Sequence, residues 1–242
     1  MISKSFAQYR SNNFNHETKP TYFFDEENIE ITKSIFTKKI EHKLFYYVRI
    51  ESDTTVFYKS QWSYFFGKLN SSNKSQLFKL LNSRSNVDTT KTIVIHYLDT
   101  LKLKTDYPKE NKIVYNKDST SHKHLFSYKS FLDGYERCYE KYESRKTYAN
   151  IYHFYYINKG HPESIKHFEW KKDNYGTLKS LFLKNLKIPG IIIINTKGEY
   201  FINFLYDPDP EPRLHKKLMM SNKNWIRPFK KFIKSVEKFN DY

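Results

Sequence analysis

Four consecutive isoleucines at 191–194 constrain the fold of this chain more than any other feature of its sequence. They are β-branched and apolar at every position, so we expect a strand that is covered on both of its faces. Gly198 can adopt the left-handed backbone that a short hairpin loop needs, and residues 200–206 are expected to return antiparallel beside the first strand. This hairpin is predicted to lie at the centre of a sheet.

Other segments rich in Phe, Tyr, Val and Ile indicate further strands. They lie at 43–50, 54–59, 91–98, 150–157 and 165–171. The first two are separated by Glu-Ser-Asp, which predicts a second hairpin. Most of the core is expected to be aromatic, because the chain holds 20 Phe and 21 Tyr.

Apolar residues at helical spacing predict helices at 130–146 and 175–187 and a helix capped by Ser71 or Ser72. The aromatic segment 62–69 is also expected to be helical. A C-terminal helix is predicted with Pro228 in its first turn and with Phe229, Phe232, Ile233 and Val236 facing the core. The expected fold class is therefore α+β, with one mixed, mostly antiparallel sheet and helices packed on it.

The domain organisation is expected to be simple. Residues 1–20 are polar and predict a flexible N-terminal segment. Residues 21–242 are expected to form a single α+β domain. The least patterned region is 99–127, a long loop or the place where a domain boundary would fall.

The chain carries 42 Lys and Arg against 26 Asp and Glu, a formal net charge of +16. An anionic partner is the usual cause of such an excess, and nucleic acid, DNA or RNA, is the commonest one. A membrane surface is the lesser alternative. Lys172, Lys230, Lys231 and Lys234 are the residues that we expect to contact nucleic acid.

The sequence also favours an intracellular location. The single Cys138 excludes an intrachain disulfide and a multi-cysteine zinc site. The first residues lack the apolar run of a signal peptide, and no stretch is apolar for long enough to span a membrane. We expect an intracellular, cytoplasmic protein.

One catalytic hypothesis rests on Glu169-Trp170-Lys171. A carboxylate on a strand can hold Mg²⁺, and a lysine two residues later shares its face and can orient the attacking water. The spacing is similar to the Glu-x-Lys part of the PD-(D/E)xK nuclease motif, and the likeness covers roughly 130–195. It departs from that pattern because the preceding strand, 150–157, carries no acid, so Glu163 is the only available second metal ligand. The alternative is a surface ion pair across strands.

Three functional hypotheses therefore stand side by side. The first is a basic nucleic-acid-binding protein, with Mg²⁺-dependent cleavage by Glu169, Lys171 and Glu163 as its catalytic form. The second is a non-catalytic structural or interaction protein. The third is a metal-independent ribonuclease that uses His153, His161 or His167 with a Glu or Lys. The glycines are too widely spaced for a dinucleotide fingerprint or a P-loop, which argues against the common nucleotide-dependent enzymes.

Overall fold

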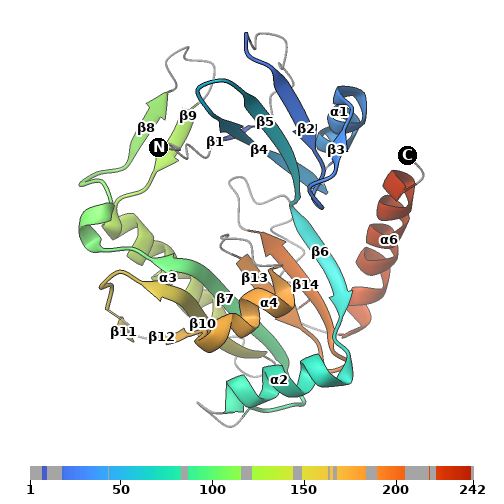
Figure 1. The fold of residues 1–242 in the computed structure, drawn as a ribbon. Helices are drawn as coiled ribbons and strands as arrows, with labels where there is room; N and C mark the ends of the chain where they lie inside the picture. The colour runs from blue at the N-terminus through green and yellow to red at the C-terminus, as the bar shows by residue number, and fades with distance from the viewer. Residues whose placement is uncertain are drawn as a thin grey trace. The chain divides into compact units, whose positions relative to one another are not determined.

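The computed structural model (Figure 1) describes residues 7–9, 18–42, 44–82, 87–115, 122–143, 149–162, 164–165, 168–183, 190–204, 218 and 222–240. The chain divides into two compact units, Met1–Phe65 with Phe229–Tyr242, and Phe66–Pro228. The segment 99–127 lies inside the second unit. The single domain expected over 21–242 and the flexibility expected of 1–20 stay predictions.

The first unit is built on a five-stranded sheet in the order β1-β4-β5-β2-β3. Its strands are β1 (Ala7–Tyr9), β2 (Thr21–Phe24), β3 (Glu30–Ile31), β4 (Phe45–Glu51) and β5 (Val56–Trp62). The predicted hairpin is confirmed, since β4 and β5 pair antiparallel with Ile50 opposite Phe57. Helix α1 (Lys33–Glu41) is capped by Thr32, and its buried Phe36 packs with Phe23, Tyr47, Val56 and Tyr58.

The segment 62–69 is not helical, so that prediction is wrong. Residues Tyr64–Lys68 form strand β6 instead. Tyr64 and Phe66 are buried while Phe65 and Gly67 are half-buried, which is the period of two that a strand imposes. Aromatic side chains suit a pleated, half-buried surface, and pairing within a sheet has overridden the helical spacing that the sequence suggested.

The second unit contains a seven-stranded sheet in the order β11-β12-β10-β7-β13-β14-β6, in which β6 is the strand at one end. Its further strands are β7 (Thr92–Leu101), β10 (Ala149–Asn158), β11 (Ser164–Ile165), β12 (Phe168–Lys172), β13 (Gly190–Ile194) and β14 (Glu199–Phe204). Strand β10 runs parallel to both β7 and β12, whereas β13 is antiparallel to β7 and β14. With two mixed sheets and packed helices, the α+β class is confirmed.

The isoleucine strand β13 is an interior strand, and β7 occupies the middle of the order. All five residues of β13 are buried, and Ile192 lies opposite Ile95 on one side and Ile202 on the other. The predicted hairpin with β14 is therefore confirmed. Its loop needs Gly198, whose φ is +79° and whose N–H donates to the Asn195 carbonyl at 2.9 Å.

The helices of the second unit begin close to their predicted positions. Helix α2 (Ser71–Asn82) is capped by Asn70, which accepts from the Asn73 N–H at 2.7 Å, rather than by Ser71 or Ser72. Helix α3 spans Tyr128–Glu143, and α4 spans Thr177–Phe182 after a short 3-10 turn, Asn174–Gly176. The remainder of the helix predicted at 175–187 falls largely outside the described residues.

The region 99–127 carries more structure than the sequence suggested. Strand β7 continues to Leu101, a 3-10 turn spans Lys104–Asp106, and β8 (Lys112–Tyr115) pairs antiparallel with β9 (His122–Leu125). Strands β8 and β9 form a separate two-stranded sheet (Figure 1). The expectation of one long loop was wrong there.

The C-terminal helix α6 (Ile226–Asn240) follows a 3-10 turn, Asn222–Trp225, and carries Pro228 in its first turn as predicted. Phe232 is 3% exposed, and Phe229 and Val236 are half-buried. Ile233 is 39% exposed, so its predicted place in the core is wrong. It lies about 100° around the helix from Phe232, at the margin of the apolar stripe. None of the helices in the described part of the chain is long and apolar enough to cross a membrane.

Candidate functional site

Strand β12 orients Glu169 and Lys171 as its alternation predicts. Trp170 is 1% exposed, whereas Glu169 is exposed and Lys171 is half-buried. The Lys171 ammonium lies 5.5 Å from the centroid of the Tyr152 ring, a cation–π contact that supports its aliphatic stem against β10. Glu169 and Lys171 therefore share the face of β12 opposite Trp170.

The metal-binding part of the nuclease hypothesis gains no second ligand from the described residues. Glu169 is opposite Ser164 of the edge strand β11, and Glu163 lies outside the described part of the chain. Within the described ranges, no three His, Cys, Asp or Glu side chains gather closely enough to hold a metal ion. The Mg²⁺ site stays a prediction.

A buried polar cluster lies near the carboxyl ends of the parallel strands. Asp99, near the end of β7, accepts from the Lys179 ammonium at 2.5 Å, and that ammonium lies 4.7 Å from the Tyr156 ring centroid. Asp173 follows β12 and accepts from the backbone N–H groups of Leu178 at 3.0 Å and Lys179 at 3.1 Å. These contacts attach the first turn of α4 to the sheet.

Burial shapes the electrostatics of this cluster. It raises the pKa of the Asp173 carboxyl, although hydrogen bonds from the start of α4 oppose the shift. The Tyr97 hydroxyl donates to Asp173 at 3.4 Å, and burial, followed by the nearby Asp173 and Asp99 carboxylates, raises the Tyr97 pKa. Tyr97 is therefore a hydrogen-bond donor that stays protonated near neutral pH.

Two of the three histidines proposed for ribonuclease chemistry are buried. The His153 ring stacks on His96 with centroids 4.9 Å apart, and burial lowers the His153 pKa to about 4. His161 is 3% exposed, and its Nδ1 lies 2.8 Å from the Pro162 carbonyl oxygen. His167 falls outside the described residues. His153 and His161 thus line the interior rather than an accessible surface.

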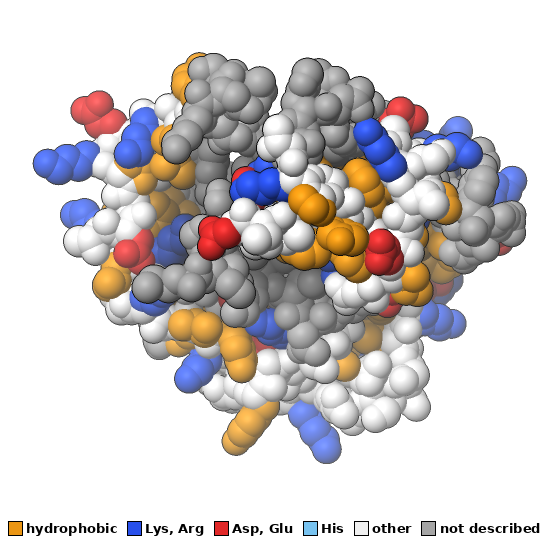
Figure 2. Space-filling view, turned by 45° about the horizontal axis from the view of Figure 1, so that its top comes forward, with side chains coloured by type: hydrophobic (Ala, Val, Ile, Leu, Met, Phe, Trp, Pro, Cys, Tyr) orange, Lys and Arg blue, Asp and Glu red, His pale blue; other side chains and the backbone are white. Residues whose placement is uncertain are grey.

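The lysines expected to bind nucleic acid are exposed. Lys230, Lys231 and Lys234 lie within about 100° of the circumference of α6, on the side opposite Phe232, and form what we call the α6 lysine stripe. Lys172 is exposed at the end of β12, in the other compact unit. On the face shown in Figure 2, the described Lys and Arg side chains are scattered among hydrophobic, acidic and uncharged ones.

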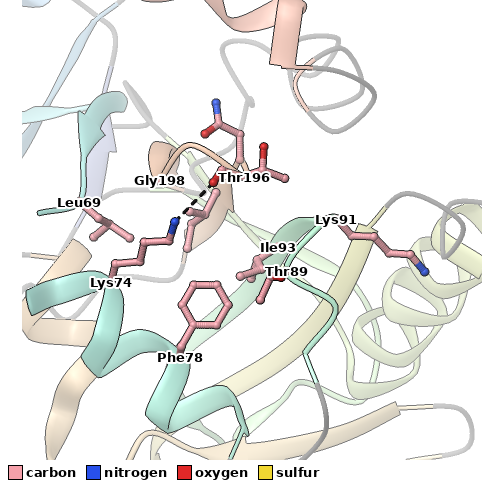
Figure 3. Close-up of a pocket in the computed structure, with 10 residues that line it drawn as sticks. Leu69, Lys74, Phe78, Thr89, Lys91, Ile93, Thr196 and Gly198 are labelled. Atoms are coloured by element: carbon pink, nitrogen blue, oxygen red, sulfur yellow. Dashed lines mark hydrogen bonds between the residues drawn. The ribbon is translucent and has the colours of Figure 1, made fainter. Parts of the chain in front are cut away.

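A pocket of about 240 Å³ opens between α2, the start of β7 and the loop that joins β13 to β14. Ile93 and Ile194, register partners on β7 and β13, line its apolar part together with Leu69 and Phe78. Lys74 extends toward the Thr196 carbonyl oxygen at 3.4 Å, whereas the ammonium of Lys91 points away (Figure 3). One ammonium therefore faces a mostly apolar pocket.

Asp99, Asp173 and Lys179 were not among the functional residues predicted from the sequence. Asp99 is a lone acid inside an apolar strand, and Asp173 stands where a strand gives way to a helix; both signals are visible in the sequence. The sequence does not show that Asp99 pairs with Lys179, and it does not show the pocket. Both features depend on which strands become neighbours.

Comparison with known proteins identifies no relative: no family model, no curated protein and no solved structure matches this chain.

Proposed function

We propose that this protein binds nucleic acid and that the α6 lysine stripe contacts phosphates. The stripe is the observation that carries the proposal. Lys230, Lys231 and Lys234 are exposed side by side, and none forms an ion pair with a carboxylate of the described residues. Ammonium groups held together in this way displace condensed counterions from a polyanion, which favours binding.

A second surface favours a nucleic acid over an acidic protein. Tyr175 is 100% exposed, and its φ of +62° places a non-glycine residue in the left-handed region. That backbone conformation is uncommon for a bulky residue and costs free energy without any packing gain for the side chain. Exposed aromatic rings stack on unpaired bases, and Tyr175 follows the exposed Lys172 by three residues. We therefore infer that unpaired nucleotides are bound at this second surface.

The test is fluorescence anisotropy of the full chain with labelled single-stranded and duplex DNA of equal length and with single-stranded RNA, over a series of salt concentrations. We expect binding whose affinity falls steeply with salt. Poly-glutamate serves as the competitor that represents an acidic protein partner. Binding of poly-glutamate as tight as that of the oligonucleotides, or no oligonucleotide binding at low salt, would contradict the proposal.

The stacking role of Tyr175 has its own control. Tyr175→Ala is expected to weaken single-stranded binding by about tenfold, since one stacked base contributes about 1–3 kcal/mol. Tyr175→Phe keeps the ring and should bind as the unsubstituted protein does. Duplex binding should be unchanged in both variants, and equal losses for single-stranded and duplex DNA would exclude stacking.

A further inference from the structure

The pocket beneath the β13–β14 loop combines an apolar interior with one inward-directed cation. Ile93 and Ile194 are each 3% exposed, and Leu69 is 7% exposed, so buried apolar side chains line this part of the pocket. Phe78 of α2 adds a ring whose centroid lies 6.0 Å from the Lys74 ammonium. A ligand that fills this space must be apolar over most of its surface.

Lys74 has donor capacity to spare. Its ammonium carries three N–H groups, and the contact to the Thr196 carbonyl oxygen is 3.4 Å, near the long limit of a hydrogen bond. No carboxylate among the described residues pairs with it. By contrast, Lys91 is paired with Asp88 at 3.6 Å, and its ammonium points outward (Figure 3). Among the described cations that line the pocket, Lys74 is therefore the one that a negative group inside it would meet.

The loop that forms one wall is held in place before any ligand arrives. The Asn195 side-chain oxygen accepts from the N–H groups of Lys197 and Glu199, both at 3.0 Å, and its amide donates to Glu199 at 2.7 Å. The Leu69 N–H donates to the Gly198 carbonyl at 2.9 Å, which joins the loop to the start of α2. A preformed wall lowers the entropic cost of binding.

Size and charge together define the ligand class. At about 240 Å³ the pocket is smaller than the roughly 300–1,000 Å³ that drug-sized ligands occupy, so it suits a single ring with a short side chain. One ammonium in an apolar setting matches one negative charge, because a doubly charged phosphate would lose more hydration than Lys74 can replace. We propose that the pocket binds a small aromatic monocarboxylate, with its ring against Phe78 and its carboxylate on Lys74.

The probe is phenylacetate, and its binding to the full chain is followed by calorimetry and by NMR. Phenylacetamide has the same shape without the charge, and acetate has the charge without the ring. We expect saturable binding of phenylacetate that is about tenfold tighter than that of phenylacetamide, as the loss of one charge-assisted hydrogen bond implies. Equal affinity for phenylacetate and phenylacetamide, or the absence of saturable binding, overturns the proposal.

Three variants locate the bound probe. Lys74→Met should reduce phenylacetate affinity by about tenfold and leave phenylacetamide unaffected. Lys91→Met, whose ammonium points away, is the matched control and should bind phenylacetate as the unsubstituted protein does. Thr89→Trp places a bulky ring on an exposed residue of the rim and should block both compounds. If Lys74→Met and Lys91→Met have the same effect, or Thr89→Trp binds normally, phenylacetate does not occupy this pocket.

Discussion

Lys179 of α4 and Asp99 of β7 form an ion pair of 2.5 Å although 80 residues separate them in the chain. Each side chain is only 10% exposed. The backbone N–H of the same lysine donates to Asp173, so one residue links α4 to the end of β7 and to the end of β12. The position of this helix on the sheet therefore depends on polar contacts as well as on apolar packing.

Removing one partner of this buried pair should be costly. Lys179→Met leaves the Asp99 carboxylate without its counter-ion, and we expect a loss of about 3–5 kcal/mol in the free energy of unfolding, measured by urea denaturation. Replacing both partners with Lys179→Met and Asp99→Leu should recover much of that loss.

The matched control for that experiment is the exposed pair Lys129–Asp133, whose side chains are 87% and 41% exposed. Lys129→Met should cost less than about 0.5 kcal/mol. Equal losses for Lys179→Met and Lys129→Met would show that the Lys179–Asp99 pair is not buried in solution.

Acid should destabilise the protein through His153. Burial lowers its pKa to about 4 in the folded state, from an ordinary value of 6.5. Between those two values the unfolded chain binds more protons than the folded chain does. The contribution of neutral His153 to stability is therefore fully present above pH 6.5 and is lost as the pH falls toward 4. The loss approaches about 3 kcal/mol at the acid end. Urea titrations across this window should show the decline, and His153→Leu should flatten it. A slope that His153→Leu leaves unchanged would assign the decline to other groups.

The C-terminal helix offers a test of its phase. The ring of Phe232 lies 5.2 Å from Phe65 and 5.9 Å from Trp62, centroid to centroid. Phe232→Ala should therefore cost about 3–5 kcal/mol in stability. Lys231→Ala, one residue away on the exposed side, should cost less than about 0.5 kcal/mol. Similar losses for the two substitutions in thermal or urea unfolding would mean that the helix is rotated about its axis.

Local patterns predicted the fold where they were strong. The isoleucine run and Gly198 specified an interior hairpin, because an apolar stretch of that length has to be covered on both faces and the turn requires a left-handed residue. The same reasoning failed at 62–69, where aromatic residues at both helical and alternating positions left the period ambiguous and pairing within a sheet decided the outcome.

The candidate sites were less predictable than the fold. The exposure of residues along α6 follows from a period of 3.6, and Lys230, Lys231 and Lys234 are exposed as expected. Ile233, at the margin of the apolar face, was misplaced. The pocket combines residues from α2, β7 and the β13–β14 loop. Its existence depends on the strand order, and no periodicity in the sequence encodes that order.

The nuclease form of the hypothesis makes a separate prediction. If Glu169 binds Mg²⁺ with Glu163 and Lys171 orients the water, the purified protein should cleave DNA or RNA with Mg²⁺ and stop with EDTA. Glu169→Gln should then abolish cleavage and leave binding intact, while Glu110→Gln, at another exposed carboxylate, should change neither. Cleavage that survives EDTA, or that Glu169→Gln leaves unaltered, would exclude this mechanism.

The salt dependence of nucleic-acid binding tests the central proposal most directly. The variant Lys230→Gln, Lys231→Gln, Lys234→Gln removes the α6 lysine stripe, and the variant Lys68→Gln, Lys102→Gln, Lys109→Gln removes the same charge from exposed residues elsewhere. Each phosphate contact contributes about 0.7–0.9 to the slope of log affinity against log salt. We predict that the stripe variant lowers the magnitude of that slope by about 2–3 units and that the control variant changes it by less than about one unit. Equal slopes for the stripe variant and the unsubstituted protein would contradict the assignment of the stripe as a phosphate-binding surface.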